Sequence, residues 1–84
     1  MSATIESRRI KIIAFGQISE FTDSNEFFSP EFKDTDTLKE WLIDKYPLLK
    51  NMKFYMAVNR KLIKGNVPLS ENCEVALLPP FSGG

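Results

Sequence analysis

The sequence predicts a single domain of the α+β class, and three observations support this. First, the chain has 84 residues, which suffice for one hydrophobic core. Second, five short segments have the apolar content of β-strands. Third, the segment between the second and third of these has an apolar residue every three or four positions, as on the buried face of a helix.

The first expected strand follows Arg9, in the residues IKIIAFG. Its side chains alternate between two faces, and the face expected in the core holds Ile10, Ile12 and Ala14. Phe15 would then lie on the outer face, at the far end of the strand. Residues 17–25 are mostly polar and are expected to form a loop. Residues 26–32 predict a weaker second strand, and Pro30 either places it at an edge of the sheet or ends its pairing there.

The helix is expected to begin at Thr37, because Thr37 and Glu40 have the spacing of a capping box. Pro47 restricts the residue before it, so the helix should end at about Tyr46. The apolar residues with helical spacing, which should face the core, are Leu38, Trp41, Leu42, Tyr46 and Leu49.

Three more strands are expected after the helix, at residues 54–58, 62–64 and 74–78. Pro79 and Pro80 end the last of them, since proline has no N–H to donate to a neighbouring strand. The order strand, strand, helix, strand, short strand, strand predicts a mixed sheet curled over one main helix. This is the β-grasp arrangement of an α+β domain.

The expected domain organisation has three parts, with a folded centre and short polar or small residues at both ends. These parts are a flexible N-terminal extension at 1–8, the β-grasp domain at 9–80 and a flexible C-terminal tail at 81–84.

The composition excludes several classes of function. Acidic and basic residues number 11 each, and a net charge of zero argues against a nucleic-acid partner or a membrane partner. The chain has no histidine, so the commonest metal ligand and the usual catalytic base are both missing. The sequence shows neither a membrane-spanning apolar run nor a signal-peptide pattern. We therefore expect a cytoplasmic protein that is not an enzyme by itself and holds neither a metal nor a cofactor.

Cys73 is the one cysteine, so neither a disulfide within the chain nor a multi-cysteine metal site can form. It is also the obvious candidate for a nucleophile. Glu71 and Glu74 lie close to it in the sequence, and carboxylates disfavour the thiolate. We therefore expect a structural or incidental role for Cys73.

The last eleven residues, EVALLPPFSGG, contain a strand, two prolines and a thin tail. Gly83 and Gly84 do not stabilise a fold, because glycine loses more backbone entropy on ordering than any other residue. Without side chains, they could thread a narrow channel and leave the carboxylate within reach from either face. We interpret the C-terminal carboxylate of Gly84 as the reactive group and the folded domain as the part that carries it. The alternative is that small terminal residues simply fray.

These residues resemble the small subunit of molybdopterin synthase, a family of ubiquitin-like sulfur carriers. The segment EVALLPPFSGG is similar to the family pattern E-V-A-F-F-P-P-V-[ST]-G-G. The first strand IKIIAFGQ, the strand end Ala57-Val58-Asn59 and the helix opening at Thr37 are similar as well. The resemblance covers about residues 9–84.

The resemblance implies a mechanism. A ubiquitin-activating-like adenylyltransferase would use ATP to adenylate Gly84, and sulfur would then replace AMP to give a thiocarboxylate. The tail would enter the large subunit of molybdopterin synthase and donate sulfur to cyclic pyranopterin monophosphate. The carrier binds no cofactor in this scheme. The residues that the resemblance assigns to partner binding are Phe15, Leu62, Leu78, Phe81 and Ser82.

Two other functions stay open at this point. The same carrier chemistry could deliver sulfur to thiamine or to tRNA, although thiamine carriers usually lack the diproline. Alternatively, the chain could be a non-catalytic β-grasp binding module with an idle tail.

Overall fold

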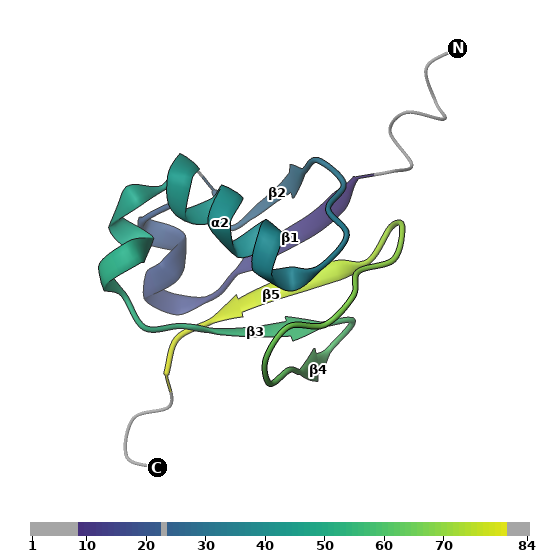
Figure 1. The fold of residues 1–84 in the computed structure, drawn as a ribbon. Helices are drawn as coiled ribbons and strands as arrows, with labels where there is room; N and C mark the ends of the chain where they lie inside the picture. The colour runs from purple at the N-terminus through teal and green to yellow at the C-terminus, as the bar shows by residue number, and fades with distance from the viewer. Residues whose placement is uncertain (1–8, 23, 81–84) are drawn as a thin grey trace.

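A five-stranded sheet and one main helix form the part of the chain that the structure, a computed structural model, describes: residues 9–22 and 24–80 (Figure 1). The strands are β1 (Ile10–Ala14), β2 (Glu26–Ser29), β3 (Tyr55–Val58), β4 (Lys61–Leu62) and β5 (Glu74–Leu78). The helical segments are α2 (Thr35–Lys45) and the 3-10 helices η1 (Gly16–Glu20) and η2 (Pro47–Asn51). The predicted flexible segments, 1–8 and 81–84, lie outside the described residues.

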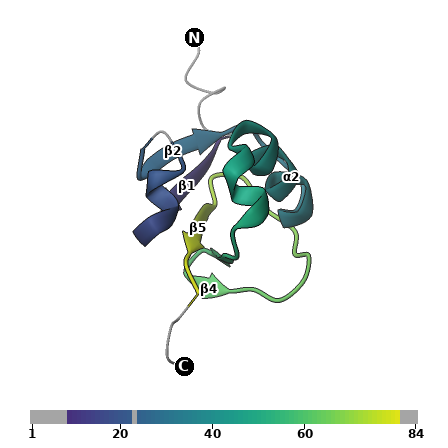
Figure 2. The ribbon, with the colours of Figure 1, turned by 90° about the vertical axis from the view of Figure 1, so that its left-hand side faces the viewer.

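The strands lie in the order β2-β1-β5-β3-β4 across the sheet. β1 and β5, the first and last strands, pair in parallel, and the other neighbours are antiparallel. α2 lies over one face of this mixed sheet (Figure 1 and Figure 2). The prediction of a β-grasp domain is therefore confirmed, as is the place of the second strand at an edge.

β1 and β5 each bury every second residue, which is why alternate positions of both strands are apolar. In the parallel register, Ile12 lies beside Val75 and Ala14 lies beside Leu77. All four side chains are at most 3% exposed. The predicted inner face of the first strand is therefore confirmed.

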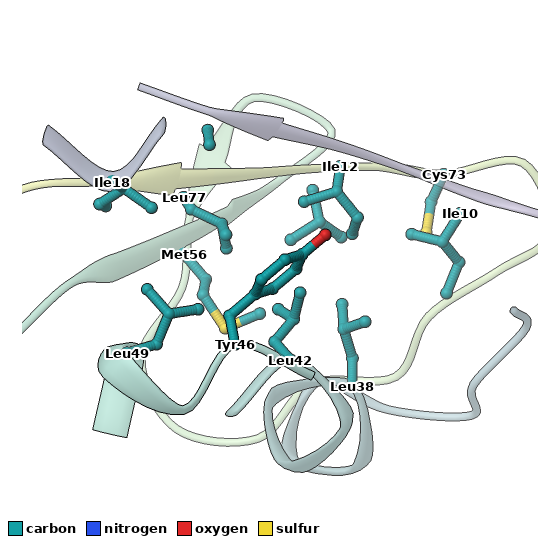
Figure 3. Packing of buried hydrophobic residues seen from close by; sticks show 12 residues of the cluster. Ile10, Ile12, Ile18, Leu38, Leu42, Tyr46, Leu49, Met56, Cys73 and Leu77 are labelled. Carbon is teal, nitrogen blue, oxygen red and sulfur yellow. The ribbon is translucent and has the colours of Figure 1, made fainter. Parts of the chain in front are cut away.

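The core lies between the sheet and the helical layer (Figure 3). The helical side contributes four of the predicted core residues, Leu38, Leu42, Tyr46 and Leu49. Trp41, the fifth, is only partly buried, and its ring centroid lies 5.9 Å from that of Phe32. The Tyr46 ring meets Phe27 of β2 edge-on, at 5.6 Å between centroids. Burial of this apolar face is the main force that holds the helix on the sheet.

The helix begins at Thr35 and not at Thr37, so the predicted capping box is wrong. Asp34 is the N-cap: its Oδ1 accepts hydrogen bonds from the Thr37 backbone N–H at 3.0 Å and from the Thr37 hydroxyl at 2.6 Å. Asn66, which lies in the loop after β4, donates to Asp34 Oδ2 at 3.2 Å. Asp34 therefore caps the helix mainly through Thr37, and the distant loop adds one further hydrogen bond to its carboxylate.

The expected loop after the first strand contains the 3-10 helix η1, and the connector after the main helix contains the 3-10 helix η2. Each contains one fully buried apolar residue, Ile18 in η1 and Leu49 in η2, so tertiary packing shapes these connectors. Four predicted strands differ in their bounds. The first ends at Ala14, before Phe15. The second ends at Ser29, just before Pro30, the third begins at Tyr55, and the fourth covers Lys61–Leu62.

The cap makes the stability of the domain depend on pH. Hydrogen bonds from the Thr37 hydroxyl and N–H, and then from Asn66, lower the pKa of Asp34. Because the pKa is lower in the folded state, the cap contributes fully above about pH 4 and loses its contribution as the pH falls further.

We expect Asp34→Asn to lower the melting temperature at neutral pH, because it keeps an acceptor for Thr37 but removes the negative charge at the helix N-terminus and the acceptor for Asn66. The difference from the wild-type chain should shrink below about pH 4, because the wild-type carboxylate becomes protonated there. Thermal unfolding by circular dichroism across this pH range measures the difference. A difference that stays constant at every pH would contradict this role of Asp34.

Candidate functional site

The helical layer leaves the outer face of the sheet open (Figure 2). One row of paired residues crosses this face from β1 to β4: Ile13, Ala76, Ala57 and Leu62. Paired residues of neighbouring strands point to the same side of a sheet, so these four side chains lie next to one another. The middle of this face is recessed, because the side chains of Ala76 and Ala57 are single methyl groups.

Larger apolar side chains border the alanines at the end of the sheet where β5 leaves it. Leu78 pairs with Tyr55 of β3. Phe15 follows β1, and its backbone N–H donates to the Leu77 carbonyl at 3.0 Å, which holds it beside β5. Phe15 is 46% exposed and Leu62 is 57% exposed, so both are available to a partner. We refer to five of these residues as the outer apolar patch: Phe15, Ala57, Leu62, Ala76 and Leu78.

A hollow of about 360 Å³ lies over this patch, and its lining residues are Phe15, Ala57, Arg60, Glu74, Ala76 and Leu78. The structure therefore brings Phe15 and Leu78 together, as the resemblance implies. Leu62 lies on the same face, opposite Ala57, but outside the hollow. Sequence reasoning missed Ala57, Ala76 and Arg60 as parts of the site, because the register of the strands brings the two alanines together and the turn between β3 and β4 places Arg60.

A two-residue turn between β3 and β4 places Arg60 at one side of the hollow. Asn59 and Arg60 have φ angles of 50° and 72°, the left-handed conformation that tight hairpin turns require. The Asn59 N–H donates to the Glu74 carbonyl at 2.7 Å, and Asn59 Oδ1 accepts from the Glu74 N–H at 3.0 Å. These two hydrogen bonds fix the turn to the start of β5. The hollow thus combines an apolar floor with one basic and one acidic side chain.

The last strand leads the chain away from the sheet beside this hollow. Pro79 is half-buried and Pro80 is exposed. The remaining predicted site residues lie outside the described residues: Phe81, Ser82, Gly83 and Gly84. The structure therefore describes the chain as far as Pro79 and Pro80, which directly follow Leu78.

Cys73 lies just before β5 and is 2% exposed within the core cluster. Burial raises the pKa of its thiol. The sequence analysis names the neighbouring carboxylates as the reason why the thiolate is disfavoured, but the main cause of the raised pKa is removal of the thiol from water. A neutral thiol that solutes cannot reach is a poor nucleophile, and this supports the structural role expected for Cys73.

Residues 9–22 and 24–80 contain no cluster of three or more acidic, histidine or cysteine side chains that could hold a metal ion. Over the same residues, no helix has the length and apolar character needed to cross a membrane.

Comparison with known proteins identifies relatives of nearly full length. The family model described as the ThiS family matches residues 12–84. The molybdopterin synthase sulfur carrier subunit of Escherichia coli (strain K12) is 33% identical over 81 residues, which cover 89% of this chain and 99% of that protein.

Two solved structures have the same fold. The small archaeal modifier protein 1 from Methanosarcina acetivorans has a TM-score of 0.73 and 26% identity, over 90% of this chain and 96% of its own. A protein–protein complex of subunits 1 and 2 of the molybdopterin-converting factor from Helicobacter pylori 26695 contains a chain with a TM-score of 0.69 and 29% identity. That similarity covers 90% of this chain and 99% of the Helicobacter chain.

The burial of Cys73 predicts slow reaction with thiol reagents. In the native protein at about pH 8, an aromatic disulfide reagent should react on the order of 100-fold more slowly than in denaturant, because reaction requires opening of the core. Absorbance of the released thiol measures both rates. Equal rates would contradict the buried position of this side chain.

Proposed function

This chain belongs to the ThiS family, and from that premise we propose that it is a sulfur carrier whose reactive group is the C-terminal carboxylate of Gly84. The single observation that best supports the proposal is the extent of the family match, which runs from residue 12 to Gly84 and so includes the two terminal glycines. In the described residues, Pro79 directly follows Leu78 of the outer apolar patch, so a partner that binds the patch would meet the chain where it leaves β5.

A carboxylate is too poor an electrophile to react with sulfur directly, so we propose that an adenylyltransferase activates it. ATP supplies AMP, which becomes joined to the Gly84 carboxylate as pyrophosphate leaves. A sulfur nucleophile then attacks the carbonyl carbon, the bond to AMP breaks, and a thiocarboxylate remains. Because this step consumes ATP, we place the protein in the cytoplasm.

We propose molybdopterin synthase as the destination of the sulfur, with cyclic pyranopterin monophosphate as the acceptor. The name of the Escherichia coli relative and the two-subunit Helicobacter complex support this choice over thiamine or tRNA. The carrier would act as the small subunit and dock on a large subunit, and it would have no catalytic activity alone.

The outer apolar patch suits docking on energetic grounds. Burial of its three large side chains, Phe15, Leu62 and Leu78, contributes at most about 1.5–3 kcal/mol each. Ordering the four residues after Pro80 costs about 1–2 kcal/mol each in backbone entropy. The two sums are similar, so the patch can offset the cost of ordering the tail while the complex remains reversible.

The decisive test of the carrier chemistry is an intact mass measurement. The chain is incubated with an activating enzyme of the molybdopterin pathway, ATP and sulfide. We expect a mass gain that corresponds to one oxygen replaced by sulfur. A variant lacking Gly84 is the control and should gain nothing. A wild-type chain that gains no mass, beside a reference carrier that does, would overturn the proposal.

The acceptor is tested separately with the modified chain. Addition of a large synthase subunit and cyclic pyranopterin monophosphate should yield molybdopterin, whereas thiamine and tRNA acceptor systems should receive no sulfur. Transfer to one of these systems instead would leave the carrier chemistry intact and change its destination.

Docking through the outer apolar patch predicts that Phe15→Ala weakens binding to the large subunit. The expected loss is about 10- to 100-fold, the equivalent of burying one large apolar side chain. Isothermal titration calorimetry measures the dissociation constant. Leu48→Ala is the matched control, because Leu48 is 63% exposed but lies in η2 on the helical side of the sheet. Equal effects of the two substitutions would argue against this docking face.

A further inference from the structure

A close contact between Gly16 and Pro79 joins the end of β1 to the exit of the last strand. We propose that Gly16 is a positioning residue, which sets the direction in which the chain leaves β5 and thereby presents the Gly84 carboxylate to the activating enzyme. This inference rests on the proposed function, because it concerns the delivery of the same carboxylate.

The backbone of Gly16 has a conformation that favours glycine. Its φ angle is +59°, in the left-handed region, where other residues are strained. This conformation turns the chain from β1 into η1. The turn is held by the Ser19 hydroxyl, which donates to the Gly16 carbonyl at 2.8 Å, and by the Ile18 N–H, which donates to the Phe15 carbonyl at 3.2 Å.

The missing side chain of Gly16 is what makes room for Pro79. A Cβ atom at position 16 would lie 3.1 Å from Cγ of Pro79 and 3.7 Å from its Cδ. The separation of 3.1 Å is tighter than ordinary van der Waals contact. A pyrrolidine ring is joined to its own backbone at both ends, so it cannot rotate away as a flexible side chain would. A side chain at position 16 would therefore push on the Pro79 ring, and the ring or its backbone would shift by a few tenths of an ångström.

The strand end that precedes Pro79 is firmly placed. The Phe15 N–H donates to the Leu77 carbonyl at 3.0 Å, two residues before the proline. Leu78 and Pro79 each precede a proline, which restricts their ψ angles, and both prolines have fixed φ angles. A displacement at Pro79 is therefore transmitted to Pro80 and cannot be absorbed between them.

The reaction is sensitive to such a displacement because the carboxylate must meet the nucleotide in a defined geometry. A misplacement of about 1 Å can cost about 100-fold in rate. The docking face should persist, because the Phe15 N–H remains held by the Leu77 carbonyl at 3.0 Å. The effect should therefore fall on kcat for thiocarboxylate formation, with little change in the KM for the carrier.

Gly65 provides a matched control for Gly16→Ala. Its φ angle is +72°, but a Cβ atom there would meet nothing within 4 Å. Gly16→Ala and Gly65→Ala should both lower the melting temperature, by about 4–8 °C, because both place alanine in the left-handed region. Only Gly16→Ala should lower kcat for thiocarboxylate formation, by at least about 10-fold, while the KM for the carrier stays within about 2-fold.

A double-mutant cycle separates the contact from the backbone strain. Pro79→Ala removes the Cγ and Cδ atoms that a side chain at position 16 would meet. In the Pro79→Ala background, Gly16→Ala should therefore lower kcat by no more than about 2-fold, although it still lowers the melting temperature. If Gly16→Ala fails to fold, Gly16→Asn is compared with Gly65→Asn, because asparagine tolerates the left-handed region but retains Cβ.

The outcomes distinguish this inference from the proposed function. If the wild-type chain forms no thiocarboxylate, the proposed function fails, and the positioning role fails with it. If the wild-type chain reacts and Gly16→Ala reacts as fast as Gly65→Ala, the carrier function stands and the positioning role of Gly16 is wrong. Equal losses from Gly16→Ala with and without Pro79 would also overturn the role, since the contact would then not be its cause.

Discussion

The rest of the domain depends on the parallel pairing of β1 with β5, the two strands farthest apart in the sequence. A parallel pair cannot be closed by a tight turn, so the intervening chain must cross over, and here the crossover includes α2. The apolar side of the helix then covers the inner face of the sheet. Because both strands run in the same direction, they finish at the same end of the sheet. Phe15 therefore lies close to Leu78, and Gly16 lies close to Pro79.

The two faces of β5 serve different purposes. Val75 and Leu77 point inward and are fully buried, so they stabilise the fold. Ala76 and Leu78 alternate with them on the outer face and line the hollow. One short strand thus joins the core, the outer apolar patch and the two prolines that follow it. A partner that docks on the patch as proposed would not need to disturb the core.

Much of the fold could be predicted because it follows from local patterns. The inner face of the first strand follows from alternation, the end of the last strand follows from the diproline, and four helical core residues follow from their spacing. The helix start differs from the prediction because the segment offers two local caps. The spacing of Thr37 and Glu40 favours Thr37, whereas Asp34 caps the helix through the N–H and hydroxyl of Thr37, and Asn66 from a distant loop adds a further hydrogen bond.

The site was only partly predictable. The resemblance implies Phe15, Leu62 and Leu78, which the structure places on one face. Ala57 and Ala76 have no distinctive sequence signal, and they become the floor of a hollow only through the register of three strands. The contact of Gly16 with Pro79 likewise exists only once β1 and β5 are paired.

The parallel central pair also determines how the domain resists mechanical force. Tension between residues 9 and 80 would draw β1 toward its beginning and β5 toward its end, so the two strands would slide past each other along their length. In this shear geometry, the hydrogen bonds from Lys11 to Cys73 and from Phe15 to Leu77 are loaded together and must break together. A partner that grips the chain beyond β5 and pulls would therefore stretch the domain along the direction in which its sheet is strongest.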